Sequence, residues 1–98
     1  MKVIWSKAAL KDLKDVYDFI AESSEHYAVE IANNIYLRSN QLSNFPYSGP
    51  EQHFRKRRRK EYRYLVEGNC KIIYSVEKDT VIIEAVFDTR QSPTKLRL

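Results

Sequence analysis

Hydrophobic residues in the first half of the chain recur at the spacing of an amphipathic helix. A β-prone run at Lys2–Trp5 is followed by Ser6, a residue type that often caps a helix N-terminus. Apolar residues then fall at positions i, i+3, i+4 and i+7, which are Leu13, Val16, Tyr17 and Ile20. Because these positions share one face of a helix, we expect a helix over about Lys7–Glu22. The β-prone run before it predicts a short strand.

A second helical pattern follows a polar break at Ser23–Glu25. Its apolar positions recur at spacings of three, four and seven residues, at Ala28, Ile31, Ala32, Ile35 and Leu42. Pro46, Gly49 and Pro50 then prevent any continuation of the helix. We therefore expect a helix over about Glu25–Ser43, which forms an antiparallel helical hairpin with the first.

The second half of the chain changes to the period of β-strands. Residues 61–67 and 70–76 alternate between two faces, and residues 80–87 are nearly all apolar, as in a central strand. Breaks of hairpin length separate the three runs. The expected order is β-α-α-β-β-β, a single α+β domain over residues 1–98 in which the helical hairpin packs on one face of an antiparallel sheet.

The length of the first hairpin loop decides which side chains share a face of this sheet. With a two-residue loop, Arg63 lies opposite Tyr74 and on the other face from Lys71. With a three-residue loop that begins at Glu67, Arg63 lies opposite Ile73 and shares a face with Lys71. The sequence is compatible with both registers. The difference matters because cations on the face that the helices leave open would form a site.

The excess of positive charge in the chain lies in one segment. The sequence has 17 Lys and Arg against 13 Asp and Glu, a net charge of +4. Six consecutive basic residues carry this excess: Arg55, Lys56, Arg57, Arg58, Arg59 and Lys60. Such a run is compatible with a solvated loop, a localisation signal or a surface for an anionic partner. The nearby rings of Phe54, Tyr62 and Tyr64 are candidates for base stacking or for the core.

Several classes of protein are disfavoured by what the sequence lacks. Cys70 is the single cysteine, so an internal disulfide is excluded and a reducing compartment is expected. His26 and His53 have no ligand partners at metal-site spacing, and two glycines cannot build a phosphate-binding loop. No apolar run suits a membrane span or a signal peptide. We expect a cytoplasmic protein without a metal or cofactor.

Four segments in this order and spacing resemble the RelE/ParE superfamily of bacterial type II toxins. They are VIWSKAALKDLKDVYDFI (3–20), LSNFPYSG (42–49), YRYLVEGNCKIIYSV (62–76) and VIIEAVFDTRQSP (81–93). The resemblance covers nearly the whole chain and implies a helical hairpin against a twisted antiparallel sheet. It also implies a cognate antitoxin with an acidic toxin-binding segment, for which the basic run would be a docking surface.

Members of this superfamily differ in activity, and the resemblance implies two alternatives. RelE-like members cut mRNA on the ribosome, whereas ParE-like members poison DNA gyrase. Arg63, Lys71 and Arg90 match RelE-like cation positions, while Asp88 stands where a histidine is common and Leu65 replaces a basic residue. RNA cleavage needs a base, an acid and cations together, and this set lacks a proton donor. The resemblance therefore favours a ParE-like gyrase inhibitor over an mRNA interferase that uses these four residues. A non-catalytic nucleic-acid-binding module is a further alternative.

Overall fold

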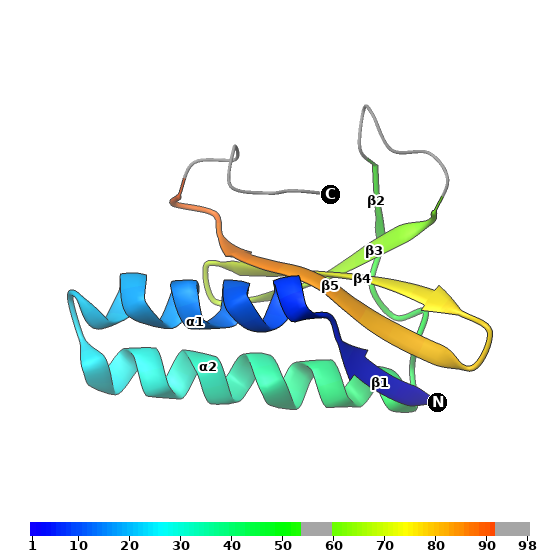
Figure 1. The fold of residues 1–98 in the computed structure, drawn as a ribbon, viewed down its shortest axis with the longest axis horizontal. Coiled ribbons are helices and arrows are strands. Elements are labelled where there is room, and N and C mark those ends of the chain that lie inside the picture. The colour runs from blue at the N-terminus through cyan, green and yellow to red at the C-terminus, as the bar shows by residue number, and fades with distance from the viewer. Residues whose placement is uncertain (54–59, 92–98) are drawn as a thin grey trace.

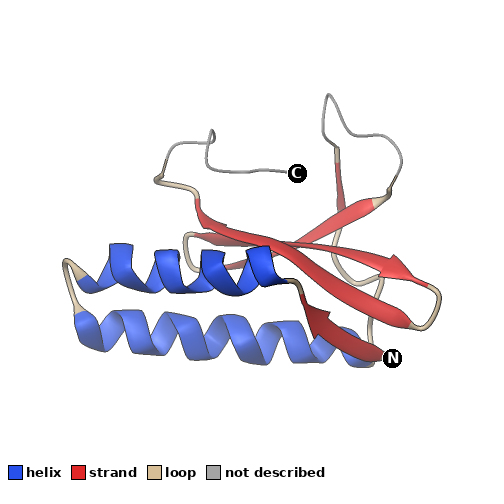
Figure 2. Ribbon diagram, in the orientation of Figure 1, coloured by secondary structure: helices blue, strands red, loops and turns tan. Residues whose placement is uncertain are grey.

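The structure is a computed structural model that describes residues 1–53 and 60–91. Two helices lie side by side along one face of a twisted sheet, so the α+β architecture expected from the sequence is confirmed (Figures 1 and 2). The elements are β1 (Lys2–Trp5), α1 (Lys7–Ala21), α2 (Glu25–Asn40), the 3₁₀ turn η1 (Gln41–Ser43), β2 (Glu51–Gln52), β3 (Tyr62–Glu67), β4 (Cys70–Glu77) and β5 (Thr80–Asp88).

Both helices begin where the sequence predicts. The side chains of Ser6 and Ser24 accept hydrogen bonds from backbone amides three residues further on, at 3.0 and 3.1 Å. The first helix ends at Ala21, one residue before the predicted limit. The second ends at Asn40, and the 3₁₀ turn η1 replaces the last turn of the predicted helix, as is common at helix C-termini.

The sheet has the strand order β1-β5-β4-β3-β2. Strands β3, β4 and β5 form the predicted antiparallel meander, and β1 adds to the edge of β5 in parallel. The sheet is therefore mixed, because β1 contributes a parallel edge that periodicity alone does not specify. The sequence also gave no sign of β2, since two residues are too few to show an alternating pattern.

The hairpin between β3 and β4 has the shorter of the two loops considered. Gly68 and Asn69 form it, and Gly68 adopts a φ of 58°, a left-handed conformation that suits glycine. Arg63 consequently lies opposite Tyr74, and it shares no sheet face with Lys71. The structure thus selects the register in which these two cations are separated.

The pairing of β4 with β5 contains a β-bulge. The register shifts by one residue between Ile73 and Tyr74, and Glu84 is the extra residue on β5. A bulge redirects side chains locally, and here it lies at the carboxylate that interrupts the apolar residues 81–87 of β5. The carboxylate accepts a hydrogen bond of 2.7 Å from Ser75 Oγ, which offsets the cost of burying most of the glutamate side chain.

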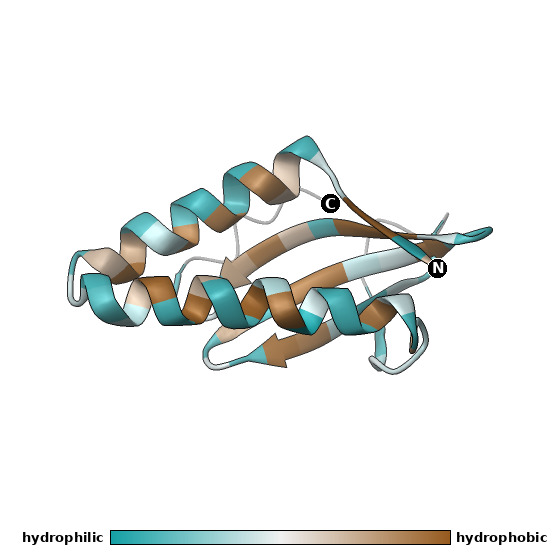
Figure 3. Ribbon diagram, turned by 90° about the horizontal axis from the view of Figure 1, so that it is seen from below, coloured by the Kyte–Doolittle hydropathy of each residue, from teal (hydrophilic) through white to brown (hydrophobic). Residues whose placement is uncertain are grey.

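The main hydrophobic core lies between the helical hairpin and the sheet. Its fully or almost fully buried members include Val16, Ile20, Ile31, Ile35, Leu42, Ile72, Tyr74, Val81 and Ile83. Figure 3 shows the matching alternation of hydrophobic and hydrophilic positions along both helices. A smaller cluster on the other face of the sheet consists of Tyr62, Ile73 and Ala85, with Tyr64 and Phe87 packed against it.

Tyr74 fastens the loop before β2 to the sheet. Its hydroxyl accepts a hydrogen bond of 3.0 Å from the amide of Gly49, and the tyrosine is fully buried. A Cβ atom at residue 49 would collide with the carbonyl oxygen of Tyr64 and with the Tyr74 hydroxyl. Glycine is therefore required at this position by the close approach of the loop to β3 and β4.

Replacing Tyr74 with Phe should lower the free energy of unfolding by about 1–3 kcal/mol, because the buried amide of Gly49 loses its partner. Denaturant unfolding followed by circular dichroism measures the change. Tyr36→Phe is the matched control, since its ring is 54% exposed and its hydroxyl can bond water in either state. The control should change stability by less than about 0.5 kcal/mol. Equal stability of the two variants would contradict the anchoring role of Tyr74.

Candidate functional site

Arg63 lies at the start of β3, where it holds the neighbouring loop and a carboxylate. Its Nη1 donates to the carbonyl oxygen of Gly49 at 2.8 Å, and its Nε and Nη2 donate to Glu61 Oε1 at 3.1 and 2.8 Å. Its guanidinium carbon also lies 5.2 Å from the centre of the Tyr47 ring. Most of the donors of this guanidinium are thus engaged within the chain.

Lys71 lies on the opposite face of the sheet. Its ammonium nitrogen is 4.1 Å from the centre of the Tyr64 ring, a cation–π contact. Within residues 1–53 and 60–91, no carboxylate forms an ion pair with it. The aliphatic part of Lys71 and the Tyr64 ring extend the small apolar cluster on this face, so both residues have a packing role.

Asp88 and Arg90 form a bidentate ion pair at the end of β5. Arg90 donates from Nε to Oδ1 at 2.9 Å and from Nη2 to Oδ2 at 2.7 Å, and its backbone amide donates to Oδ1 at 2.8 Å. These hydrogen bonds hold the pKa of the fully buried Asp88 carboxyl below its ordinary value. A carboxylate stabilised in this way is a poor general base.

Cys70 is almost fully buried at the start of β4. Burial, followed by the nearby charge of Asp88, raises the pKa of its thiol to about 11, so the thiol is protonated at neutral pH and is a poor nucleophile. No group of three His, Cys, Asp or Glu side chains in the described part of the chain is arranged to hold a metal ion. Neither described helix is long and apolar enough to cross a membrane.

Lys60 is the member of the basic run that the structure describes. Its ammonium nitrogen lies 3.1 Å from Glu77 Oε1 and 3.1 Å from Glu84 Oε2, and these carboxylates raise the pKa of Lys60. The remaining members of the run lie outside the described residues: Arg55, Lys56, Arg57, Arg58 and Arg59. Glu84 could have been identified from the sequence, because it is the one charged residue in an apolar run.

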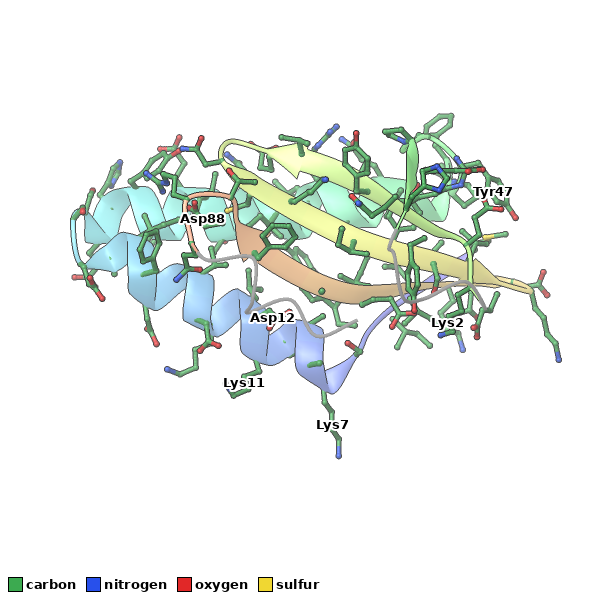
Figure 4. The ribbon with its side chains drawn as sticks, turned by 90° about the horizontal axis from the view of Figure 1, so that it is seen from above. Lys2, Lys7, Lys11, Asp12, Tyr47 and Asp88 are labelled. Carbon is green, nitrogen blue, oxygen red and sulfur yellow. The ribbon has the colours of Figure 1, made fainter. Side chains whose placement is uncertain are left out.

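The cations selected from the sequence do not converge on one site. Lys71 pairs across the hairpin with Val66, three residues along β3 from Arg63, which corresponds to about 10 Å on opposite faces. Asp88 and Arg90 lie near the turn between the helices, beside a hollow of about 140 Å³ that Phe19 helps to line. Figure 4 shows Asp88 at the end of the sheet remote from Tyr47. Lys71 pairs with Phe87, one residue before Asp88, but Asp88 pairs with Cys70 and therefore faces the other side of the sheet. Arg63 thus lies apart from the other three residues, and Lys71 and the Asp88–Arg90 pair lie on opposite faces at the same end of the sheet.

A family model described as "ParE toxin of type II toxin-antitoxin system, parDE" matches residues 3–93 of this chain. The chain belongs to the ParE toxin family. A solved structure titled "Chromosomal ParDE TA system from P. aeruginosa" is similar, with a TM-score of 0.71 and 16% sequence identity over 90% of this chain and 95% of that chain. At this identity the likeness shows the fold. A search of curated proteins finds no match.

The ParE family assignment confirms the resemblance that the four sequence segments indicated. The structure describes two of the three aromatic residues next to the basic run, and neither ring is fully exposed. Tyr62 is 8% exposed within the smaller cluster, Tyr64 is partly covered by Lys71, and Phe54 lies outside the described residues. Sequence analysis missed Phe45 and Tyr47, whose rings are exposed on the loop before β2.

Replacing Asp88 with Asn removes the charge that Arg90 pairs with and should lower the free energy of unfolding at pH 7 by about 1–3 kcal/mol. The pKa of Asp88 is lower in the folded chain than its ordinary value of 3.8. Its stabilising contribution is therefore present above that value and is lost as the pH falls through the folded pKa. Denaturant unfolding from pH 7 to pH 2 should show wild type and variant converging at the acid end.

The matched control for this prediction is Asp18→Asn. Asp18 pairs with Lys14 at 2.9 Å on the exposed side of α1, so its loss should change stability by at most about 0.5 kcal/mol. A stability difference between wild type and Asp88→Asn that stays constant with pH would show that the ionised carboxylate has no stabilising role.

Proposed function

We propose that this ParE-family chain inhibits bacterial growth by poisoning DNA gyrase. The observation that carries the proposal is the separation of Arg63 from the other candidate residues along the sheet, and of Lys71 from the Asp88–Arg90 pair by the two faces of the sheet. Cleavage of RNA through the 2′-hydroxyl requires a base, a proton donor and cations held around one phosphate. Contact with a protein target imposes no such requirement. The engaged, dispersed cations therefore support inhibition by binding over inhibition by nuclease activity.

A cognate antitoxin is the second partner in this proposal. The similar solved structure is titled a ParDE TA system, which supports an antitoxin partner for this chain as well. We assign the antitoxin's acidic segment to Arg55–Arg59, because these five consecutive cations give the chain its excess positive charge. Lys60 is set apart from them, since its ammonium already pairs with Glu77 and Glu84. Both proposed partners place the chain in the cytoplasm.

Induction of the wild-type chain in a bacterial host tests the target. Uptake of labelled thymidine and labelled leucine should be measured in parallel, and thymidine incorporation should stop first, together with induction of the DNA-damage response. Earlier loss of leucine incorporation would instead favour a ribosome-dependent mRNA interferase, with Arg63, Lys71, Asp88 and Arg90 as the residues to mutate. Normal growth with salt-dependent nucleic-acid binding would favour a binding module.

Replacing Arg57–Arg59 with Ser should weaken antitoxin binding by roughly 1–3 kcal/mol, because three charge pairs with the antitoxin's acidic segment are lost. Isothermal titration calorimetry with the purified antitoxin at several salt concentrations measures this, and the variant should show a smaller salt dependence. A matched control replaces three exposed lysines of α1, Lys7, Lys11 and Lys14, so the net charge changes equally. Equal weakening by both variants would show that net charge matters and the location of the run does not. Loss of the fold on replacing Arg57–Arg59 would contradict the docking role.

A further inference from the structure

The loop between η1 and β2 displays two aromatic side chains at the molecular surface. Phe45 is 67% exposed and Tyr47 is 60% exposed, on either side of Pro46. Figure 4 places Tyr47 at the outer edge of the molecule, at the end of the sheet remote from Asp88. We call residues 45–47 the aromatic loop. Two large exposed rings in one short loop are a feature of binding surfaces more than of solvated loops.

The aromatic loop is held in place from the inside. Arg63 Nη1 donates to the carbonyl oxygens of Gly49 at 2.8 Å and of Tyr47 at 3.5 Å, and the buried Tyr74 hydroxyl accepts from the Gly49 amide. The amide of Ser48 also donates to the carbonyl oxygen of Phe45 at 3.2 Å. These contacts fix the backbone while the rings stay outside. A pre-organised loop loses little conformational entropy when a partner covers it.

The charges beside the aromatic loop favour a cationic partner surface, whereas the basic run favours an acidic one. Arg63 is flanked by Glu61 at 2.8 Å and by Glu51 at 3.9 Å, so the three groups together carry one negative charge. Both carboxylates are about half exposed. Tyr47, Glu61 and Arg63 also line a hollow of about 110 Å³. Phosphates and an acidic antitoxin segment would be repelled here, whereas a protein surface with cations around an apolar pocket would fit.

We propose that the aromatic loop, with Glu51 and Glu61 at its rim, is the surface through which the chain contacts its target protein. The partner's surface has an apolar pocket that accepts Phe45 or Tyr47 and cations that face the two glutamates. The identity of that partner as gyrase rests on the function proposed above. The target-binding surface is then separate from the basic run that meets the antitoxin.

The test compares two double variants with matched loss of exposed apolar surface. One is Phe45→Ala with Tyr47→Ala, and the control is Tyr36→Ala with Leu37→Ala on α2, where the side chains are 54% and 59% exposed. Surface plasmon resonance measures binding to purified gyrase and, separately, to the purified antitoxin. The loop variant should bind gyrase on the order of 30-fold more weakly, as for loss of an aromatic hot spot. Its affinity for the antitoxin and both affinities of the control should stay within about threefold.

A single-residue variant tests the charge argument without removing a ring. Glu51→Lys reverses the sign of one rim charge, and Glu51 is the more distant of the two Arg63 partners. Its association rate with gyrase should fall severalfold at low salt and approach the wild-type rate at high salt. An unchanged association rate at low salt would overturn the proposed cationic partner surface.

The remaining outcomes separate this proposal from the assignment of gyrase. Wild-type affinity of the loop variant for gyrase, or an equal loss of antitoxin binding, would overturn the aromatic loop as a separate target surface. Loss of binding to a DNA oligonucleotide alone would overturn it in favour of base stacking. If the wild-type chain itself does not bind gyrase, the assignment of gyrase as the target fails. The aromatic loop as a target-binding surface is then tested by comparing growth inhibition by the two double variants. Full growth inhibition by the loop variant would then overturn it.

Discussion

The two-residue loop between β3 and β4 is the constraint on which the arrangement of the other functional groups depends. Gly68 adopts a left-handed conformation there, and a Cβ atom on it would approach the Ile31 side chain of α2 to 2.9 Å. Glycine is thus favoured at this position both by backbone conformation and by packing against the helix. Because side chains alternate along a strand, one more loop residue would have moved every β3 side chain to the other face.

This register brings Arg63 and Tyr74 together as a cross-strand pair, and both contact Gly49. One donates to the carbonyl oxygen of Gly49 and the other accepts from its amide, so the loop before β2 is held at both backbone groups. The same register directs Lys71 to the opposite face, where it covers Tyr64. The cations that resembled parts of a nuclease site therefore each contact groups of the chain itself, with Arg63 apart from the others and Lys71 on the other face of the sheet from the Asp88–Arg90 pair.

The sequence predicts those features of the fold that depend on neighbouring residues, and it does not predict those that depend on contacts between distant segments. Both helices and the three long strands could be predicted, since amphipathic periodicity and serine caps are properties of neighbouring residues. The short β2, the parallel pairing of β1 and the bulge at Glu84 depend on contacts between distant segments. The candidate site was harder still. Tyr62 is a candidate for base stacking because it is close in sequence to the basic run, but the fold buries it. The exposed Tyr47 lies further from the run along the chain.

Under the proposed function, the helices and the sheet provide a rigid support, and the segment that connects them provides the contact surfaces. The helical hairpin is committed to the core through one face of each helix, and the sheet supports a second, smaller cluster on its other face. Residues 44–61 connect η1 to β3, and they contain both the aromatic loop and the basic run. Under the proposed function, the opposite charge beside these two features would distinguish the antitoxin from the target by electrostatics.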